Sequence, residues 1–256
     1  MYAQLAPVYD HFVNWKARLT YEMPLIFEHL RTMGKDQEDL NVLDAACGTG
    51  HHAIAVAKAG YRSSGADISP EMVSIAKGNA TAADVRVDFR TAGFGQLGHA
   101  FRENAPFQAL MCLGNSLPHV SDENQMKATL QDFASVLEPD GLLIIQQRNF
   151  DQVMQKKQRW MEPQYDGNDK QNWTFFRFYD FEKDGRIRFN VLTLEREGQN
   201  HWDTQFSSTH LFPIVSSQLS SALNKSFKNV KLYGNLAGEA FNPDSSSDLV
   251  VIASRA

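Results

Sequence analysis

The most constraining feature of the sequence is a strand, a glycine-rich turn, a helix and a second strand in residues 41–69, NVLDAACGTGHHAIAVAKAGYRSSGADIS. The first strand ends in an acid, Asp44, Gly60 closes the helix, and the second strand ends in another acid, Asp67. Two strands joined through a helix run parallel, with a right-handed crossover. This segment therefore predicts an α/β fold whose ligand lies at the carboxyl ends of the strands.

The alternation of strand and helix continues to about residue 148. The run TYEMPLIFEHLRTM predicts an earlier helix that starts late or carries Pro24 in its first turn, because proline lacks an N–H group. Strands VRVDF, FQALMCL and LLIIQQ follow, and residues 121–137 carry the apolar stripe of a helix. We predict a doubly wound, mostly parallel sheet.

The pattern changes between residues 151 and 213. The runs WTFFRFYDFE, GRIRFNVLTLER and TQFSSTHLF are rich in aromatic and β-branched residues and predict antiparallel strands. The helix SSQLSSALNKSF and the strands NVKLYG and DLVVIASR then resume the first sheet. We therefore predict one domain from residues 1–150 and 214–256, with residues 151–213 inserted as an antiparallel β lid that carries specificity.

Composition narrows the class of partner. The formal net charge is −5 and the sequence pI is about 5.9, whereas a nucleic-acid surface normally needs an excess of Lys and Arg. No apolar run is long enough for a membrane span, and no secretory leader is recognisable. Cys47 and Cys112 lack metal-site spacing, so we expect free thiols and no metal. The sequence predicts a cytoplasmic protein that binds a small molecule, and it is compatible with a homo-oligomer.

The glycine turn GTGHHA formally matches the G-x-G-x-x-G/A fingerprint of dinucleotide folds. A nicotinamide cofactor would bring a pyrophosphate to this turn, close to the negative charge of Asp44. S-adenosylmethionine would instead bring an ammonium and a sulfonium, which Asp44 favours. Asp67, about 20 residues beyond the glycines, suits a ribose diol in either case.

Three segments together resemble the successive motifs of the class I S-adenosylmethionine-dependent methyltransferases: VLDAACGTG, GADISPEMVSIAK and ALMCLGNSLPHV. Their order and spacing cover roughly residues 40–150. The segments LAPVYD, CLGNSLPH and QRNFD are similar, more narrowly, to the glycine and sarcosine N-methyltransferase group. The resemblance implies a seven-stranded, Rossmann-like methyltransferase fold and S-adenosyl-L-methionine as the cofactor.

The resemblance also implies roles for single residues at the cofactor. Asp67 would bind both ribose hydroxyls, Ile68 would pack on adenine, and Arg18, in WKARLTYE, would bind the methionine carboxylate. The other residues implied for the cofactor are Asp44, Ala46, Gly48, Gly50, Ala92, Gly93, Phe94, Leu113 and Gly114. Gly93 stands where relatives often place an acid or asparagine against the adenine amine, so adenine must rely there on backbone groups and on Phe94.

Polar residues that follow two strands are candidates for binding the acceptor. Arg148 and Asn149 follow the strand LLIIQQ, and Asn115 follows FQALMCL, so we expect all three at the carboxyl edge of the sheet. An arginine can hold a carboxylate through two parallel hydrogen bonds, which suits a small amino acid. Alternatively, Arg148 pairs with an acid of the insertion, Asp151 or Glu162.

Other candidates have two interpretations. His119 either acts as a base or orients the substrate, or it is structural. Five aromatic residues of the insertion form either a cation–π wall or the core of its sheet: Trp160, Trp173, Phe175, Phe176 and Phe178. The catalytic candidates are therefore Asn115, His119 and Arg148, and the substrate-binding candidates are Tyr9, Asn115, Arg148 and Asn149.

Methyl transfer from a sulfonium is an in-line displacement, so alignment and exclusion of water can supply most of the catalysis. The sequence thus favours a small-molecule N-methyltransferase that acts on an amino acid or a similar carboxylate-bearing amine. The alternatives are methyl transfer to oxygen or carbon of another metabolite, and a catalytically silent S-adenosylmethionine-binding protein.

Overall fold

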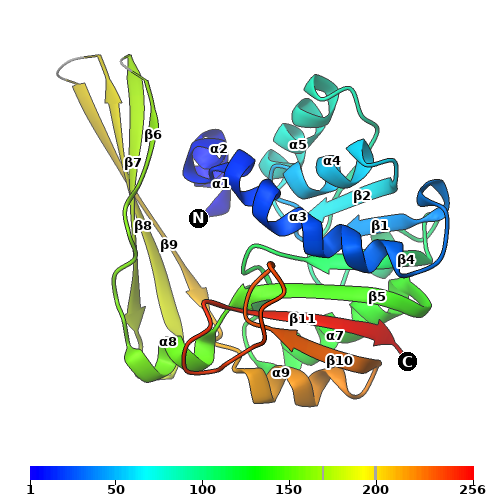
Figure 1. Cartoon of the computed structure of the whole chain (residues 1–256). Helices are drawn as coiled ribbons and strands as arrows, with labels where there is room; N and C mark the ends of the chain where they lie inside the picture. Colours follow the sequence, from blue (N-terminus) through cyan, green and yellow to red (C-terminus); the bar gives the residue numbers. More distant parts are fainter. Residues whose placement is uncertain (169, 199–200) are drawn as a thin grey trace.

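The computed structural model describes residues 1–168, 170–198 and 201–256, and these residues fold around two separate β-sheets (Figure 1). The larger sheet has seven strands in the order β10, β11, β5, β4, β1, β2, β3. Their bounds are β1 Asn41–Asp44, β2 Arg62–Asp67, β3 Asp88–Thr91, β4 Phe107–Cys112, β5 Leu137–Arg148, β10 Phe227–Tyr233 and β11 Asp248–Arg255. Strands β1 to β5 are mutually parallel, and β11 and β10 are antiparallel to their neighbours. The predicted doubly wound, mostly parallel sheet is confirmed.

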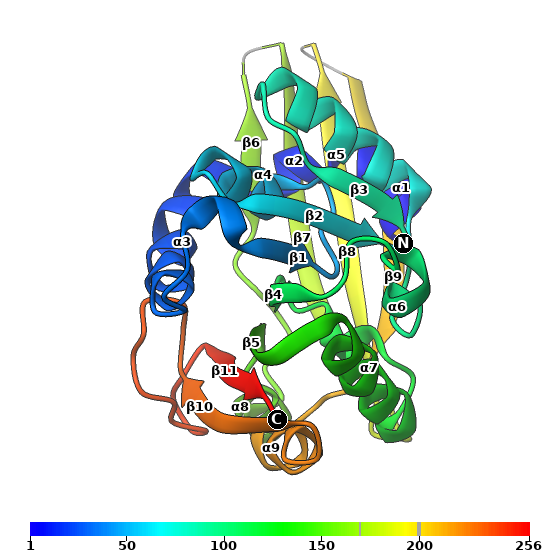
Figure 2. The same ribbon diagram turned by 90° about the vertical axis from the view of Figure 1, so that its right-hand side faces the viewer.

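Helices cover both faces of this sheet (Figure 2). Helices α3 Trp15–Arg31, α4 His51–Lys58 and α5 Pro70–Ala82 lie on one face, and α6 Leu97–Ala100, α7 Glu123–Val136 and α9 Ser216–Leu223 lie on the other. Successive strand residues alternate between the faces, so that Leu110 packs under α7 and Met111 packs under α3. Because both faces are buried, the central strands are nearly continuous apolar runs, which made them recognisable in the sequence.

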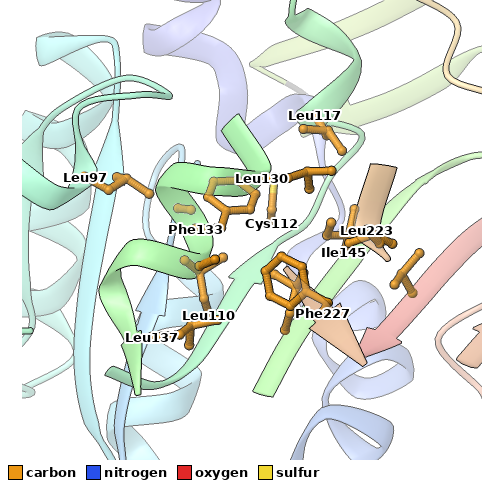
Figure 3. Packing of buried hydrophobic residues seen from close by; sticks show 14 of the residues in the cluster. Leu97, Leu110, Cys112, Leu117, Leu130, Phe133, Leu137, Ile145, Leu223 and Phe227 are labelled. Carbon is orange, nitrogen blue, oxygen red and sulfur yellow. The ribbon is translucent and has the colours of Figure 1, made fainter. Parts of the chain in front are cut away.

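The larger hydrophobic cluster fills the space between the sheet and helices α6, α7 and α9 (Figure 3). Phe133 of α7 and Leu97 of α6 are fully buried there, together with Leu110 and Cys112 of β4. Burying one large apolar side chain of this kind stabilises a fold by about 1.5–3 kcal/mol. The apolar stripe expected in residues 121–137 faces this cluster, and the predicted helix is confirmed.

The N-terminal region is more helical than predicted. It contains α1 Tyr2–Leu5, η1 Ala6–Val8 and α2 Tyr9–Phe12, which lie between the two sheets in Figure 1. Helix α3 then begins at Trp15, because the Asn14 side chain accepts a hydrogen bond from the N–H of Ala17 (3.1 Å) and caps it. Pro24 lies in the interior of α3, so the predicted late start was wrong. The additional first turn carries Arg18.

The smaller sheet is antiparallel and is formed by β6 Gln164–Gly167, β7 Gln171–Phe181, β8 Ile187–Glu197 and β9 His201–Leu211, in that order. The prediction of antiparallel strands after the fifth strand is confirmed. Helix α8 Phe150–Lys156 and strand β6 were missed, since α8 is short and the residues of β6, QYDG, show no apolar alternation. Short 3₁₀ helices η2 Gln37–Asp39 and η3 Leu117–His119 complete the secondary structure of the described ranges.

The order of the strands positions a ligand site. Strand β1 lies between β2 and β4, so the connections that leave β1 and β4 diverge at the carboxyl edge. Ligands of open α/β sheets bind in the crevice at this point. The glycine turn after β1 and the loop after β4, residues 113–116, therefore face each other across it.

A substitution at Gly50 tests how closely the glycine turn packs against its neighbours. Its φ is +85°, and an added Cβ would lie 2.7 Å from Cζ of Phe89 and 2.9 Å from Cβ of Ala76. We expect Gly50→Ala to lower the free energy of unfolding by about 2–4 kcal/mol, from backbone strain and overpacking together. Chemical denaturation measures this loss.

Gly185 is the matched control, because its φ is +86° and no atom lies within 4 Å of an added Cβ. Gly185→Ala should cost only the backbone strain, about 1 kcal/mol. Equal losses in the two variants would contradict the packing account.

Candidate functional site

Two cavities at the carboxyl edge of the larger sheet meet at Tyr9 and Gly114, which line both. We call the smaller one, of 310 Å³, the Asp67 cavity, and the larger one, of 450 Å³, the Arg148 cavity. Predicted residues that line the Asp67 cavity are Tyr9, Ala46, Gly48, Asp67, Ile68, Ala92, Gly93, Phe94 and His119. Those that line the Arg148 cavity are Tyr9, Arg18, Asn115 and Arg148.

Four predicted residues line neither cavity: Asp44, Gly50, Leu113 and Asn149. Gly50 and Leu113 are packed among apolar side chains, and Leu113 accepts a hydrogen bond from Ser116 Oγ through its carbonyl (2.7 Å). Asn149 is 1% exposed; its Oδ1 caps α8, and its Nδ2 donates to the carbonyls of Pro243 and Ser246, both at 2.9 Å. The structure therefore directs the Asn149 amide towards the 242–246 loop and away from the cavities.

Asp67 is held by backbone hydrogen bonds at the end of β2. Its Oδ2 accepts from the N–H of Gly48 and its Oδ1 from the N–H of Ser69, both at 2.9 Å. Burial raises the pKa of this carboxyl, while the two N–H groups act in the opposite direction. Each oxygen can accept a further hydrogen bond, so a ligand with two adjacent hydroxyls fits here.

The wall beside Asp67 is apolar. Ile68 is 74% exposed, an unusual position for a large apolar side chain, and lines the Asp67 cavity with Phe94. The N–H of Gly93 donates to Oε1 of Gln96 (2.8 Å), so it is already used within the chain. Gln125 of α7 also lines this cavity and was missed in the sequence. An aromatic ring system fits between such walls.

Asp44 is a buried acid whose charge depends on what occupies the neighbouring cavity. It is 2% exposed, and its Oδ2 has no hydrogen-bond partner in the part of the chain that the structure describes. Burial raises its pKa to about 7; the N–H of Ala46 lowers it in part, and the charge of Asp67 raises it. The two residues that follow Asp44, Ala45 and Ala46, line the Asp67 cavity. A cationic ligand group in that cavity would stabilise the ionised form of Asp44, which fits an ammonium or a sulfonium.

Arg18 lines the Arg148 cavity, and the buried carboxylate of Glu22 holds its guanidinium in place. Its Nε donates to Oε1 of Glu22 (2.9 Å), whose Oε2 lies 2.6 Å from Nε2 of His52. Although burial opposes it, the hydrogen bond with His52 and the charge of Arg18 hold the pKa of Glu22 below its usual value. Both Nη atoms of Arg18 lie within 4 Å of the position that a Cβ of Gly114 would take. The guanidinium is thus directed to the junction of the two cavities.

Arg148 and Asn115 are brought together as predicted. Asn115, at φ +63°, accepts a hydrogen bond from the backbone N–H of Arg148 through its Oδ1 (2.9 Å). The side chain of Arg148 is 42% exposed, and its Nη1 lies 3.4 Å from Oδ1 of Asp248. Neither of the acids considered in the sequence is its partner, and Asp151 instead accepts from Ser216.

His119 lies in the Asp67 cavity and does not line the Arg148 cavity. Its ring is only partly exposed, and burial lowers its pKa to about 4. The imidazole is therefore neutral at neutral pH.

The smaller sheet contributes lining residues to both cavities that were not predicted from the sequence. Arg177 and Tyr179 of β7 and Gln164 of β6 line the Arg148 cavity, and Thr209 of β9 lines the Asp67 cavity. One signal was available: Arg177 shares a strand face with Phe175, which is fully buried, and an arginine on a buried face is uncommon.

None of the five aromatic residues considered in the sequence for a cation–π wall lines either cavity. Trp173 and Phe175 are buried in a cluster with Leu5, whereas Trp160 packs on Phe178 with ring centroids 4.8 Å apart, outside both cavities. The interpretation as sheet core therefore holds for Trp173 and Phe175.

Metal and membrane features are not found in the described ranges. No group of three or more His, Cys, Asp or Glu side chains there is placed to hold a metal ion, and both cysteines are buried free thiols. None of the helices there combines the length and apolarity needed to cross a bilayer.

The buried carboxyl of Asp44 predicts a pH dependence of stability. Its pKa rises from 3.8 to about 7 on folding, so the folded protein binds this proton more tightly than the unfolded chain. The contribution of this proton to the free energy of unfolding is complete below about pH 4, and it is lost as the pH rises through about 7. Between about pH 5 and pH 8, we expect the ligand-free protein to lose about 2 kcal/mol of unfolding free energy relative to Asp44→Asn. Identical pH profiles for the two proteins in denaturation experiments would show that Asp44 is ionised throughout.

Comparison with known proteins gives concordant results. A family model described as a methyltransferase domain matches residues 42–141. A glycine/sarcosine N-methyltransferase of Aphanothece halophytica is 37% identical over 146 residues, which cover 57% of this chain and 53% of the relative. The chain thus spans about half the length of that relative.

The fold resembles solved structures over nearly the whole chain. An S-adenosylmethionine-dependent methyltransferase from Clostridium acetobutylicum superposes with a TM-score of 0.77 at 15% identity, covering 99% of this chain and 98% of that one. An amino pentose methyltransferase from Micromonospora echinaspora, solved with S-adenosylmethionine bound, gives a TM-score of 0.67 at 14% identity and 92% coverage of both chains. Residues 42–141 thus match a methyltransferase-domain family, and the chain shares its fold with S-adenosylmethionine-dependent methyltransferases.

Proposed function

We propose that the protein transfers a methyl group from S-adenosylmethionine to the amine of a small acceptor that carries a carboxylate. The observation that carries this proposal is the junction of the two cavities at Tyr9 and Gly114. A cofactor in the Asp67 cavity and an acceptor in the Arg148 cavity would meet there. The relative named glycine/sarcosine N-methyltransferase supports an amino-acid acceptor.

The residues of the Asp67 cavity fit the cofactor. Asp67 would accept hydrogen bonds from the ribose hydroxyls, Ile68 and Phe94 would enclose adenine, and Arg18 would bind the methionine carboxylate. The unpaired Oδ2 of Asp44 suits the positive charge of the cofactor. When bound, S-adenosylmethionine supplies a methyl group on a sulfonium, which is open to displacement by a nucleophile.

The chain itself has to align the acceptor and exclude water. We propose that residues 151–213 form the lid for this purpose, because Tyr179 and Phe189 of the smaller sheet line the Arg148 cavity opposite the larger sheet. Helix α2 would complete the enclosure through Phe12. His119, which lines only the Asp67 cavity, is assigned to the cofactor side.

Arg148 is the residue that we assign to the acceptor carboxylate. Its contact with Asp248, at 3.4 Å, is longer than the 2.7–2.9 Å typical of a charge-assisted hydrogen bond. The guanidinium therefore retains donors for a ligand. Asn115 fixes the backbone at this position, and Gln146 and Tyr179 line the same cavity.

The cofactor assignment can be tested by calorimetry. S-adenosylmethionine and S-adenosylhomocysteine should bind, and NAD should not. We expect Asp67→Ala to weaken S-adenosylhomocysteine binding by about 1.5–3 kcal/mol, because hydrogen bonds to a charged group are lost. Asp184→Ala, in an exposed turn, is the control and should bind like the parent. Tight binding of NAD without binding of the adenosyl compounds would overturn the assignment.

Arg148→Lys tests the acceptor carboxylate. A lysine ammonium cannot reproduce two parallel hydrogen bonds, so the acceptor amine should lose its alignment with the sulfonium. With labelled S-adenosylmethionine and a panel of amines, we expect a higher KM, a lower kcat and a combined loss of about 2–4 kcal/mol for carboxylate-bearing acceptors. Cofactor affinity should stay close to that of the parent.

Arg188→Lys is the matched control, because Arg188 of β8 pairs with Glu182 (2.7 Å) and lines neither cavity. It should turn over at the parent rate. A best acceptor without a carboxylate, or parent-like turnover of Arg148→Lys, would rule out the amino-acid acceptor and leave the broader family assignment intact.

A further inference from the structure

A second arginine faces the acceptor cavity from the smaller sheet. Arg177 lies in the middle of β7 and lines the Arg148 cavity. Its Nη2 donates to the carbonyl of Glu162 (3.3 Å), and its guanidinium lies 5.5 Å from the ring centroid of Phe12. Its Nε is buried and has no hydrogen-bond partner in the described part of the chain.

Arg177 differs from the other arginines of this cavity in its lack of a carboxylate partner. Arg18 pairs with Glu22 at 2.9 Å, and Arg148 lies 3.4 Å from Asp248. Among residues 1–168, 170–198 and 201–256, no acid forms an ion pair with Arg177. A partly buried guanidinium without a counter-ion is unfavourable, so a ligand anion would be stabilising there.

The electrostatics agree with this geometry. Arg177 and Arg148 line the same cavity, and burial and the positive charge of Arg148 both lower the pKa of Arg177. One carboxylate held bidentately uses the hydrogen-bonding fork of one arginine. If Arg148 holds the acceptor carboxylate, the donors of Arg177 are left for another acid group.

We propose that Arg177 is a second anion-binding residue of the acceptor site, so that the acceptor is an amine with two carboxylates, one held by Arg148 and the other by Arg177. This inference rests on the proposed function and narrows its substrate class to aminodicarboxylates. The 450 Å³ of the Arg148 cavity leaves room for an acceptor larger than glycine, the smallest amino acid.

A purely structural role for Arg177 makes a different prediction. If the side chain only joins Phe12 to the backbone at Glu162, its removal should lower turnover of every acceptor by the same factor. If it binds an acid group, its removal should change the ratio between two acceptors that differ in that group alone.

Glutamate with glutamine, and aspartate with asparagine, are such pairs, because the amide matches the acid in size and lacks its charge. Using labelled S-adenosylmethionine, we expect the parent to show a kcat/KM at least tenfold higher for the better diacid than for its amide. Arg177→Gln should reduce this ratio to about one, and Arg177→Lys should restore part of it. Arg188→Gln, on the same sheet but outside both cavities, should keep the parent ratio, and thermal unfolding checks that all variants are folded.

Binding separates failure of this inference from failure of the proposed function. If some amine is methylated but the parent does not favour the diacid, or Arg177→Gln leaves the ratio unchanged, the inference is wrong and the proposed function stands. If no amine is methylated, the proposed function fails, and calorimetry with the same pairs in the presence of S-adenosylhomocysteine decides on Arg177. Tighter binding of the diacid that is lost in Arg177→Gln would support the anion site, and equal or absent binding would overturn it.

Discussion

The carboxylate of Asp67 organises the site, because it accepts hydrogen bonds both from the glycine turn after β1 and from the loop that leads into α5. Gly48, in the turn after β1, and Ser69, before α5, each donate a backbone N–H at 2.9 Å. Gly48 has a φ of +53°, and Cε1 of Tyr9 lies 3.6 Å from the position that an added Cβ would take. Hydrogen bonds to a charged group contribute about 1.5–3 kcal/mol each. They fix the width of the Asp67 cavity and the position of the turn against the N-terminal helices.

The same arrangement divides the cleft into an acidic and a basic half. Asp67 lines one cavity, with buried Asp44 behind it. Arg18, Arg148 and Arg177 line the other cavity together with the acids Glu22 and Asp248, which face Arg18 and Arg148. A cofactor with a sulfonium is therefore drawn towards the acids, and an acceptor with carboxylates towards the arginines. In the proposed function, these charges would orient both reactants towards the junction of the two cavities.

The larger sheet, and the position of the glycine turn and Asp67 at its carboxyl edge, could be predicted because their signals are local. Asp44 ends the apolar strand just before the glycine turn, and Asp67 ends the strand that follows the next helix, so one strand–helix–strand unit holds all of them. The acceptor cavity was only partly predictable: Arg148 ends a strand of the same pattern, but Arg177 comes from the smaller sheet, and its orientation depends on strand register. Asn149 was expected at the Arg148 cavity because it follows Arg148 in the sequence, but its side chain points to the 242–246 loop instead.

A crystal structure with S-adenosylhomocysteine and an aminodicarboxylate bound tests the central claim, that the two cavities hold cofactor and acceptor on either side of Tyr9 and Gly114. The account predicts adenosyl density beside Asp67 and Ile68, and acceptor density in the Arg148 cavity with its amine directed to the junction. Cofactor density in the Arg148 cavity, or an acceptor bound outside it, would contradict the account.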